Sequence, residues 1–364
     1  MDKYQLKQEE HWVLSALMST PLPFKKSFDQ DFLVHFTNKN GFSPYLYYLA
    51  TKKQVQLPDY LTLQLKKAYF ASLLRNIKIL SIRDELTELF IANKLRPVLL
   101  KGCTLATSIY PDPAIRPMSD IDMLFLNDDA EKARQLLLSY GGLCNSIEKE
   151  HDKRTGHQLP GIMYKDILIE IHRTLFDTDL NYIIPNQHLI KHLNTDQSEI
   201  IPELNFAYLA LHAYHTMRRG GIRLSWFFDL ILLSQKHTIN KSYFFEIIKD
   251  LNIEKPIREI IAKTEFIFQY KFNFTPQKFR LNLSPLEKKT LIKLIHQSDQ
   301  QNNKYSYELA LERFRNTNGI TNKLNFIKSV LSNSTGHSSN AIKRLFIVFT
   351  RLLQFGLNKL KKNK

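Results

Sequence analysis

Cysteine is scarce in this chain of 364 residues, where only Cys103 and Cys144 occur. Two cysteines cannot build a disulfide framework, so the composition predicts a protein of a reducing compartment, which we expect to be the cytoplasm. Long apolar runs are missing too, since none approaches the roughly 18 residues that a membrane span requires. The opening stretch MDKYQLKQEEHW is polar and charged, unlike the apolar centre of a secretory signal peptide.

Acidic residues are absent after Glu312, although eleven lysines and arginines follow it. The formal net charge is +16, and subtracting these eleven leaves only about +5 for residues 1–312. Residues 332–340 have the polar composition of a linker. Residues 341–364 then form a predicted basic amphipathic helix with three open roles: contact with an anionic membrane surface, contact with RNA, or packing onto the protein body. The first role would place the protein at the inner face of the membrane.

Apolar and aromatic residues are plentiful, at 43% and 12% of the chain, so a sizeable core can form. The first 94 residues read as helices, of which the longest begins near Pro58 and continues nearly to Asn93. Its apolar residues recur at helical spacing and predict a stripe that faces the core: Phe70, Leu73, Ile77, Leu80, Leu86, Leu89 and Phe90.

Two short predicted strands follow, Val98–Leu100 and Asp120–Phe125, separated by a turn at Gly102 and a helix over residues 103–110. The period of two in a strand places Asp120 and Asp122 on one face. Adjacent carboxylates repel one another, so a divalent cation between them is the expected arrangement, and an oxygen-only site suits Mg²⁺ carrying nucleotide phosphates. The alternative is a strand cap at Asp120 and an ordinary surface charge at Asp122.

A third strand is predicted over residues 165–172. Its alternation places three isoleucines on one face and Leu168, Glu170 and His172 on the other. Amides at the start of the helix that follows Gly102 offer a cradle for phosphate groups.

The segment VLLKGCTLATSIYPDPAIRPMSDIDMLF resembles the polymerase-β-like nucleotidyltransferase superfamily. It is most similar to the bacterial uncharacterised nucleotidyltransferase family, whose signature is roughly L-K-G-x-x-L followed by R-x-x-x-D-I-D-L-L. A more distant similarity links it to abortive-infection and toxin-type nucleotidyltransferases. Cys103 stands where the superfamily has a second small residue.

This resemblance implies transfer of a nucleotidyl group from an NTP, with ATP the expected donor, to an acceptor hydroxyl. Asp120, Asp122 and Glu170 would hold Mg²⁺ or Mn²⁺, and Glu170 would also act as general base. The residues expected to contact the nucleotide are Lys101, Gly102, Arg116 and Ser119.

Simpler roles remain open for several of these residues. Lys101 could pair with an aspartate, Arg116 could be a solvated loop cation, and Glu170 could lie exposed on an edge strand. His172 is equally a substrate contact or a structural histidine.

From residue 201 onward the pattern is helical. His212 and His215 share a helical face, and Asp229 lies within an apolar run, where burial requires a partner such as Arg223 or one of these histidines. The spacing permits zinc, but a hydrogen-bonded network that fixes the helical domain or lines the cleft fits the apolar surroundings better.

The sequence therefore predicts an α+β fold in which a small mixed sheet carries the carboxylates. The expected divisions are an N-terminal helical region (1–94), a nucleotidyltransferase sheet core (95–185), a C-terminal helical domain (186–331), and the linker with the basic helix (332–364). The acceptor is left open as a small molecule, a peptide or a protein. Two alternative functions are a toxin or phage-defence enzyme acting on tRNA and a non-catalytic nucleotide-binding protein.

Overall fold

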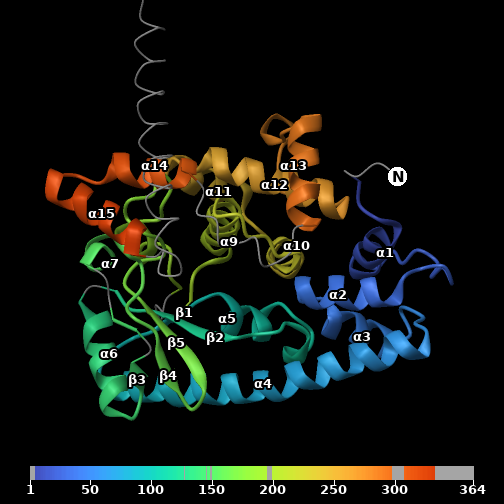
Figure 1. Cartoon of the computed structure of the whole chain (residues 1–364), viewed down its shortest axis with the longest axis horizontal. Coiled ribbons are helices and arrows are strands. Elements are labelled where there is room, and N and C mark those ends of the chain that lie inside the picture. The colour runs from blue at the N-terminus through green and yellow to red at the C-terminus, as the bar shows by residue number, and fades with distance from the viewer. Residues whose placement is uncertain are drawn as a thin grey trace, which may run out of the picture.

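The computed structural model describes residues 5–126, 128–144, 146–147, 150–194, 199–296 and 307–332. Helices precede and follow a five-stranded mixed sheet, so the α+β fold class is confirmed (Figure 1). The predicted basic helix over residues 341–364, with nearly all of the linker before it, lies outside the described residues.

Four helices precede the sheet: α1 (Gln8–Leu17), α2 (Gln30–Asn40), α3 (Ser43–Thr51) and α4 (Asp59–Ala92). The side chain of Asp29 caps α2 by accepting a hydrogen bond from the Phe32 amide, and Gly41 ends it in the left-handed region at φ 75°. Short helices and one long helix were expected here, and the expectation is confirmed.

The long helix α4 buries only part of the stripe that the apolar pattern indicates, including Leu86 and Phe90. Phe70 and Ile77 are about half exposed, whereas Ser72 and Asn76 are buried. The buried polar side chains donate hydrogen bonds to backbone carbonyls of the loop before the second strand, and this satisfies them inside the protein. The predicted stripe is therefore wrong for Phe70 and Ile77.

The sheet has the strand order β1-β2-β5-β4-β3, and β2 and β5 lie at its centre. Only the β2–β5 pair is parallel, and the other three pairs are antiparallel. The strands are β1 (Val98–Leu99), β2 (Asp120–Leu124), β3 (Leu143–Cys144), β4 (Ile162–Tyr164) and β5 (Ile167–His172). A parallel pair needs a long crossover, and the chain between β2 and β5 supplies it.

That crossover contains α6 (Asp129–Ser139) and α7 (Glu150–Thr155) as well as β3 and β4. Helix α7 occupies the first part of the polar stretch over residues 151–161. On the sheet face away from the carboxylates, Ile121 and Met123 pack into a core cluster with residues of α4 and α6. This buried layer fixes the opposite face of β2 as the one available for chemistry.

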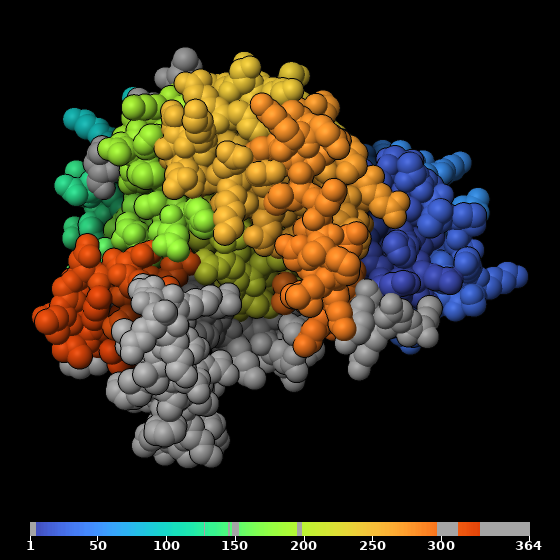
Figure 2. Space-filling view, turned by 90° about the horizontal axis from the view of Figure 1, so that it is seen from above, coloured from blue at the N-terminus to red at the C-terminus, as the bar shows by residue number. Residues whose placement is uncertain are grey.

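Within the described residues, eleven further helical segments flank the sheet. Before β2 lie α5 (Lys101–Ser108) and the short η1 (Pro113–Ile115), and after β5 come α8 (Asn186–Ile190), α9 (Pro202–Arg218), α10 (Leu224–Lys236), α11 (Lys241–Asp250), α12 (Glu254–Phe268), α13 (Pro285–His296), α14 (Tyr307–Asn316) and α15 (Ile320–Ser332), with η2 (Gln277–Phe279) among them. Figure 2 shows the upper face, where residues that follow the sheet in sequence cover most of the coloured surface and the N-terminal helices lie at one end.

One large core cluster contains residues from the first helices, from the sheet and from the last helices, including Trp12, Leu124 and Phe228. The ring of Phe42 meets Phe228 and Phe268 edge to face. The helices on either side of the sheet in sequence therefore share one core. Within the described residues, no helix is both long enough and apolar enough to cross a membrane.

Candidate functional site

The carboxylates of the two central strands stand side by side. The parallel register places Asp122 of β2 directly opposite Glu170 of β5, and Leu124 opposite His172. Because β5 pairs with β2 on one side and β4 on the other, Glu170 does not lie on an edge strand, and that alternative is wrong. Its side chain is only 19% exposed.

Asp122 is buried at 3% exposure and is held by two donors. Its Oδ1 accepts hydrogen bonds from Lys101 Nζ at 2.7 Å and from His172 Nε2 at 2.9 Å. Lys101 thus pairs with an aspartate, as one of the two sequence-based alternatives had it. His172 is fully buried and is 3.7 Å from Glu170 Oε2, so it stands between the two carboxylates.

The pKa values of these groups diverge strongly. Burial opposes the charge of Asp122, but the Lys101 ammonium and the His172 hydrogen bond outweigh it and hold the pKa well below its ordinary value. Burial and the charge of Asp122 together raise the pKa of Glu170 to about 8. Burial lowers the pKa of His172 to about 4, so its imidazole is neutral and donates Nε2–H to Asp122. Among Asp122, Glu170 and His172, the negative charge is therefore concentrated on Asp122.

Ligand atoms of Asp122, Glu170 and His172 all lie within 4.8 Å of one another, and no other such group of three occurs in the described part of the chain. Two carboxylates form a donor set that suits a hard divalent cation such as Mg²⁺ or Mn²⁺. Asp120 is not in this group. It shares the strand face with Asp122, and burial and the Asp122 charge raise its pKa.

The turn between β1 and α5 is tight, but the strain is not at the glycine. Lys101 adopts φ 47°, in the left-handed region, where a non-glycine residue is uncommon. Gly102 is required for a different reason, because a Cβ there would lie 2.9 Å from Nη1 of Arg116. The turn was expected at Gly102, and the structure places it one residue earlier.

Arg116 is not the solvated loop cation that the sequence left open. Its Nε and Nη2 donate to the two oxygens of Asp229 at 3.0 and 2.9 Å, and the Tyr110 hydroxyl donates to Oδ1 at 2.6 Å. Asp229 on α10 is 1% exposed. The expected partners of Asp229 were Arg223, His212 and His215, and the structure pairs it with Arg116 and Tyr110 instead. This bidentate pair joins the loop before β2 to the C-terminal helices.

Helix α4 fixes the other side of that loop. Asn76 Nδ2 donates to the carbonyl oxygens of Pro113 and Arg116, and Arg75 donates to those of Met118 and Ser119. Ser119 precedes Asp120 directly, and its side chain acts against burial by lowering the pKa of that carboxylate. The loop carrying two of the expected nucleotide contacts is therefore held rigidly between α4 and α10.

His212 and His215 on α9 have separate environments. His215 donates from Nε2 to the Tyr182 carbonyl at 2.7 Å, while the ring of His212 meets Trp226 edge to face. Among the described residues they do not form a metal-binding group with Asp229. The zinc alternative therefore has no support, and these histidines belong to the packing of the helical half.

Burial lowers the pKa of His215 to about 4, below the ordinary value of 6.5. The unfolded chain then binds a proton first as the pH falls, so stability is lost between pH 6.5 and 4. We expect His215 to account for up to about 3 kcal/mol of this loss. Urea unfolding of wild type and His215→Gln at pH 7 and pH 5 measures it. If the free energy of unfolding falls by the same amount for both proteins between pH 7 and pH 5, the prediction is contradicted.

Sequence reasoning missed two residues near the carboxylates. Tyr208 on α9 is 1% exposed and lies close enough to Lys101, Asp122 and Glu170 for their charges to affect its pKa. Its hydroxyl has no hydrogen-bond partner among the residues that the structure describes. Its position four residues before His212, on the same helical face, was the available signal. The ring centroids of His157 and His172 are 5.3 Å apart. No local sequence pattern indicated that His157 lies near the carboxylates.

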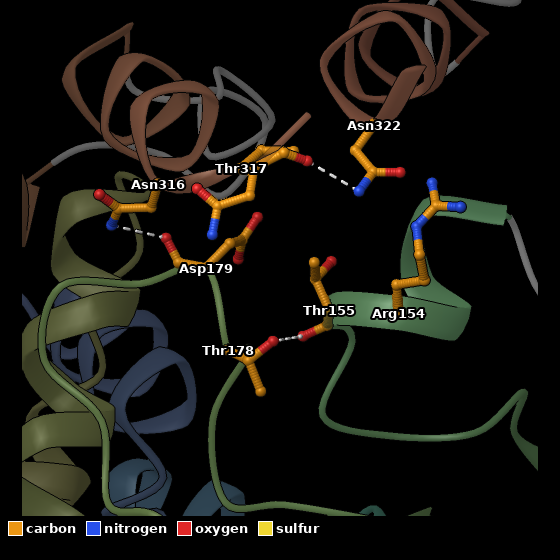
Figure 3. A pocket seen from close by; sticks show the side chains of 8 residues that line it. Arg154, Thr155, Thr178, Asp179, Asn316, Thr317 and Asn322 are labelled. Carbon is orange, nitrogen blue, oxygen red and sulfur yellow. Dashed lines mark hydrogen bonds between the residues drawn. The ribbon is translucent and has the colours of Figure 1, made fainter. Parts of the chain in front are cut away.

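A polar pocket of about 270 Å³ lies apart from the carboxylates, between α7 and the last two described helices (Figure 3). Arg154, Thr178, Asp179, Asn316 and Asn322 contribute to its lining. Asn316 Nδ2 donates to the Asp179 carbonyl at 3.0 Å, and this bond ties α14 to the loop after β5. The pocket lining includes none of the residues predicted from the sequence as nucleotide or metal contacts.

Comparison with known proteins gives one family. The model of a family described as uncharacterised nucleotidyltransferase matches residues 26–269, about two thirds of the chain and the whole of the sheet. Searches of the curated proteins and of the solved structures gave no match. The more distant similarity to toxin-type enzymes is not borne out by these comparisons and stays a prediction.

Proposed function

Because the chain belongs to the uncharacterised nucleotidyltransferase family, we propose that it transfers an NMP group from an NTP to an acceptor hydroxyl. The observation that carries this proposal is the register of β2 and β5, which places Asp122 directly beside Glu170. The Asp122 carboxylate is buried and forms an ion pair with the Lys101 ammonium. ATP is the donor that we propose. Family membership supports nucleotidyl transfer in general, and the donor base, the acceptor and the metal are parts of the proposal.

Asp120, Asp122 and Glu170 are the proposed ligands of Mg²⁺ or Mn²⁺. The bound cation would neutralise negative charge on the triphosphate. In its ionised form, Glu170 is the proposed acceptor of the proton that leaves the attacking hydroxyl, and a pKa of about 8 makes that carboxylate a stronger base than an ordinary one. His172 donates to Asp122 and thereby fixes the orientation of that carboxylate.

Lys101, Gly102, Arg116 and Ser119 are the proposed contacts of the triphosphate. Lys101 Nζ is bound to Asp122, so a cation at this carboxylate would free the ammonium for a phosphate oxygen. Arg116 uses Nε and Nη2 on Asp229, and its Nη1 lies beside Gly102 at the start of α5. That position is where a helix N-terminus favours an anion.

Calorimetric titration of each NTP tests the proposal, with and without Mg²⁺, on wild type and on Asp120→Ala/Asp122→Ala. We expect metal-dependent binding that the double variant loses, because both the carboxylates and the cation are then missing. His188→Ala, on α8 and outside the proposed site, is the control and should bind as wild type does. Wild-type protein that binds no NTP in either condition would contradict a donor-first nucleotidyltransferase.

The acceptor class follows from a second measurement. With the preferred NTP labelled on its α-phosphate, transfer to small molecules, to protein or to tRNA can be separated by size. Transfer to tRNA would favour the toxin or phage-defence alternative, and binding without any transfer would favour the non-catalytic one.

A cytoplasmic location, with or without contact to the inner membrane face, belongs to the same proposal.

A further inference from the structure

Helix α4 exposes one continuous face along its whole length. The helix runs along the lower edge of the molecule in Figure 1, and α2 and α3, which pack against it, lie above it there. Six large apolar side chains of this face are 45–70% exposed, which is unusual for one helix of a folded domain: Tyr60, Leu63, Phe70, Leu74, Ile77 and Ile91.

These residues follow a heptad repeat. Counting from Tyr60 in alternate steps of three and four residues gives ten positions as far as Ile91, and all ten are exposed. They are Tyr60, Leu63, Lys67, Phe70, Leu74, Ile77, Ser81, Asp84, Glu88 and Ile91. Such a repeat is typical of a helix that packs lengthwise against another helix. The stretch is about 47 Å long at the ordinary rise of a helix.

We propose that this face binds the same face of a second copy of the chain, with the two α4 helices antiparallel. A twofold axis that passes between residues 75 and 76 places each heptad position opposite a heptad position of the second copy. The residue numbers of the two paired positions add up to 151. Leu74 then meets Ile77 of the second copy, and Tyr60 meets its Ile91. Apolar side chains thereby occupy both the centre and the two ends of the contact.

Charge complementarity supports this arrangement over a parallel one. Lys67 falls opposite Asp84 of the second copy, and symmetry repeats the pair on the other side of the axis. In a parallel pair, Lys67 would face Lys67 and Asp84 would face Asp84, which places like charges together in both layers. The antiparallel register converts both repulsions into attractions.

The surroundings leave the face available on one flank. Lys78 and Glu85 contact the β4–β5 turn through Asp166 and Lys165, so that turn borders the stripe on one side only. The opposite face of α4 is anchored in the core by Leu61, Ile79 and Phe90 among others. Substitutions on the stripe therefore leave the fold of the chain intact.

Sedimentation velocity of the full chain over a concentration series tests the proposal. Wild type should sediment as a dimer, and Leu74→Asp should raise the dissociation constant by about tenfold or more because it buries a charge on each side of the axis. Leu286→Asp is the matched control, since Leu286 is equally exposed but lies on α13. It should leave the dimer unchanged.

Charge reversal distinguishes the register. Lys67→Asp and Asp84→Lys should each weaken the dimer by about tenfold, and the combined variant should restore it. Circular dichroism confirms that each variant is folded. A wild type that stays monomeric at every concentration would overturn the proposal. So would a dimer that Leu74→Asp leaves intact, or single reversals that the combined variant does not rescue.

Discussion

Replacing Glu170 with glutamine is expected to lower nucleotide transfer by about a thousandfold or more while leaving the protein as stable as wild type, or more stable. The loss of rate would follow from the two proposed roles of Glu170, as a cation ligand and as the proton acceptor. The unchanged stability follows from the pKa of Glu170. Burial and the neighbouring Asp122 charge raise it to about 8, so ionisation of this group opposes folding.

The sign of the pH dependence can be stated. The unfolded chain ionises Glu170 near pH 4.5, whereas the folded chain keeps its proton until about pH 8. Wild-type stability therefore falls as the pH rises through this window, and Glu170→Gln should not show that fall. Thermal unfolding at pH 6 and pH 8.5 measures the difference. A variant that is much less stable than wild type at both values would assign Glu170 a structural role.

Asp122→Asn is the matched comparison, because it removes the other carboxylate of the same pair. Asp122 is charged, buried and bound by Lys101, so this variant should lose transfer and also lose stability, leaving the Lys101 ammonium without its partner. The two variants share the loss of activity and differ in the direction of their effect on folding. Equal destabilisation by both would contradict the charge distribution described above.

The largest expected effect on folding belongs to Asp229→Ala. Asp229 is 1% exposed and holds both the Arg116 guanidinium and the Tyr110 hydroxyl. Removing it leaves a buried arginine uncompensated, which costs about 3–5 kcal/mol of unfolding free energy. Equilibrium unfolding in urea measures this loss.

A double replacement separates the charge from the packing. Arg116→Met/Asp229→Leu removes both charges while keeping apolar volume, so it should recover most of the stability lost in Asp229→Ala. Tyr110→Phe removes one hydrogen bond only and should cost about 1 kcal/mol. If Asp229→Ala proves no more harmful than Tyr110→Phe, the ion pair is not what joins the loop before β2 to α10.

Local patterns were sufficient for much of the fold. The period of two around Asp120 and Glu170 predicted the two central strands, and the period of about 3.6 residues located most helices. The direction in which β5 pairs with β2 was not readable from either segment, because parallel pairing depends on the path of the crossover. The pairing nevertheless decides that Asp122, and not Asp120, faces Glu170.

Two further errors have a physical cause of the same kind. The apolar stripe of α4 pointed to Phe70 and Ile77 as core residues, but hydrogen bonding of Asn76 to the loop turned the polar face inward. The partner of Asp229 was sought among nearby residues of the sequence, and Arg116 lies far from it along the chain. Both outcomes rest on contacts between distant segments, about which periodicity is silent.

The parallel pairing of β2 with β5 also bears on how the protein acquires its site during folding. The two central carboxylates come from strands separated by an entire crossover with two helices and two strands of its own. Closing such a loop costs chain entropy before any pairing is gained, and non-local pairing of this kind is slow. The proposed site therefore cannot assemble until β5 has been synthesised and has docked beside β2.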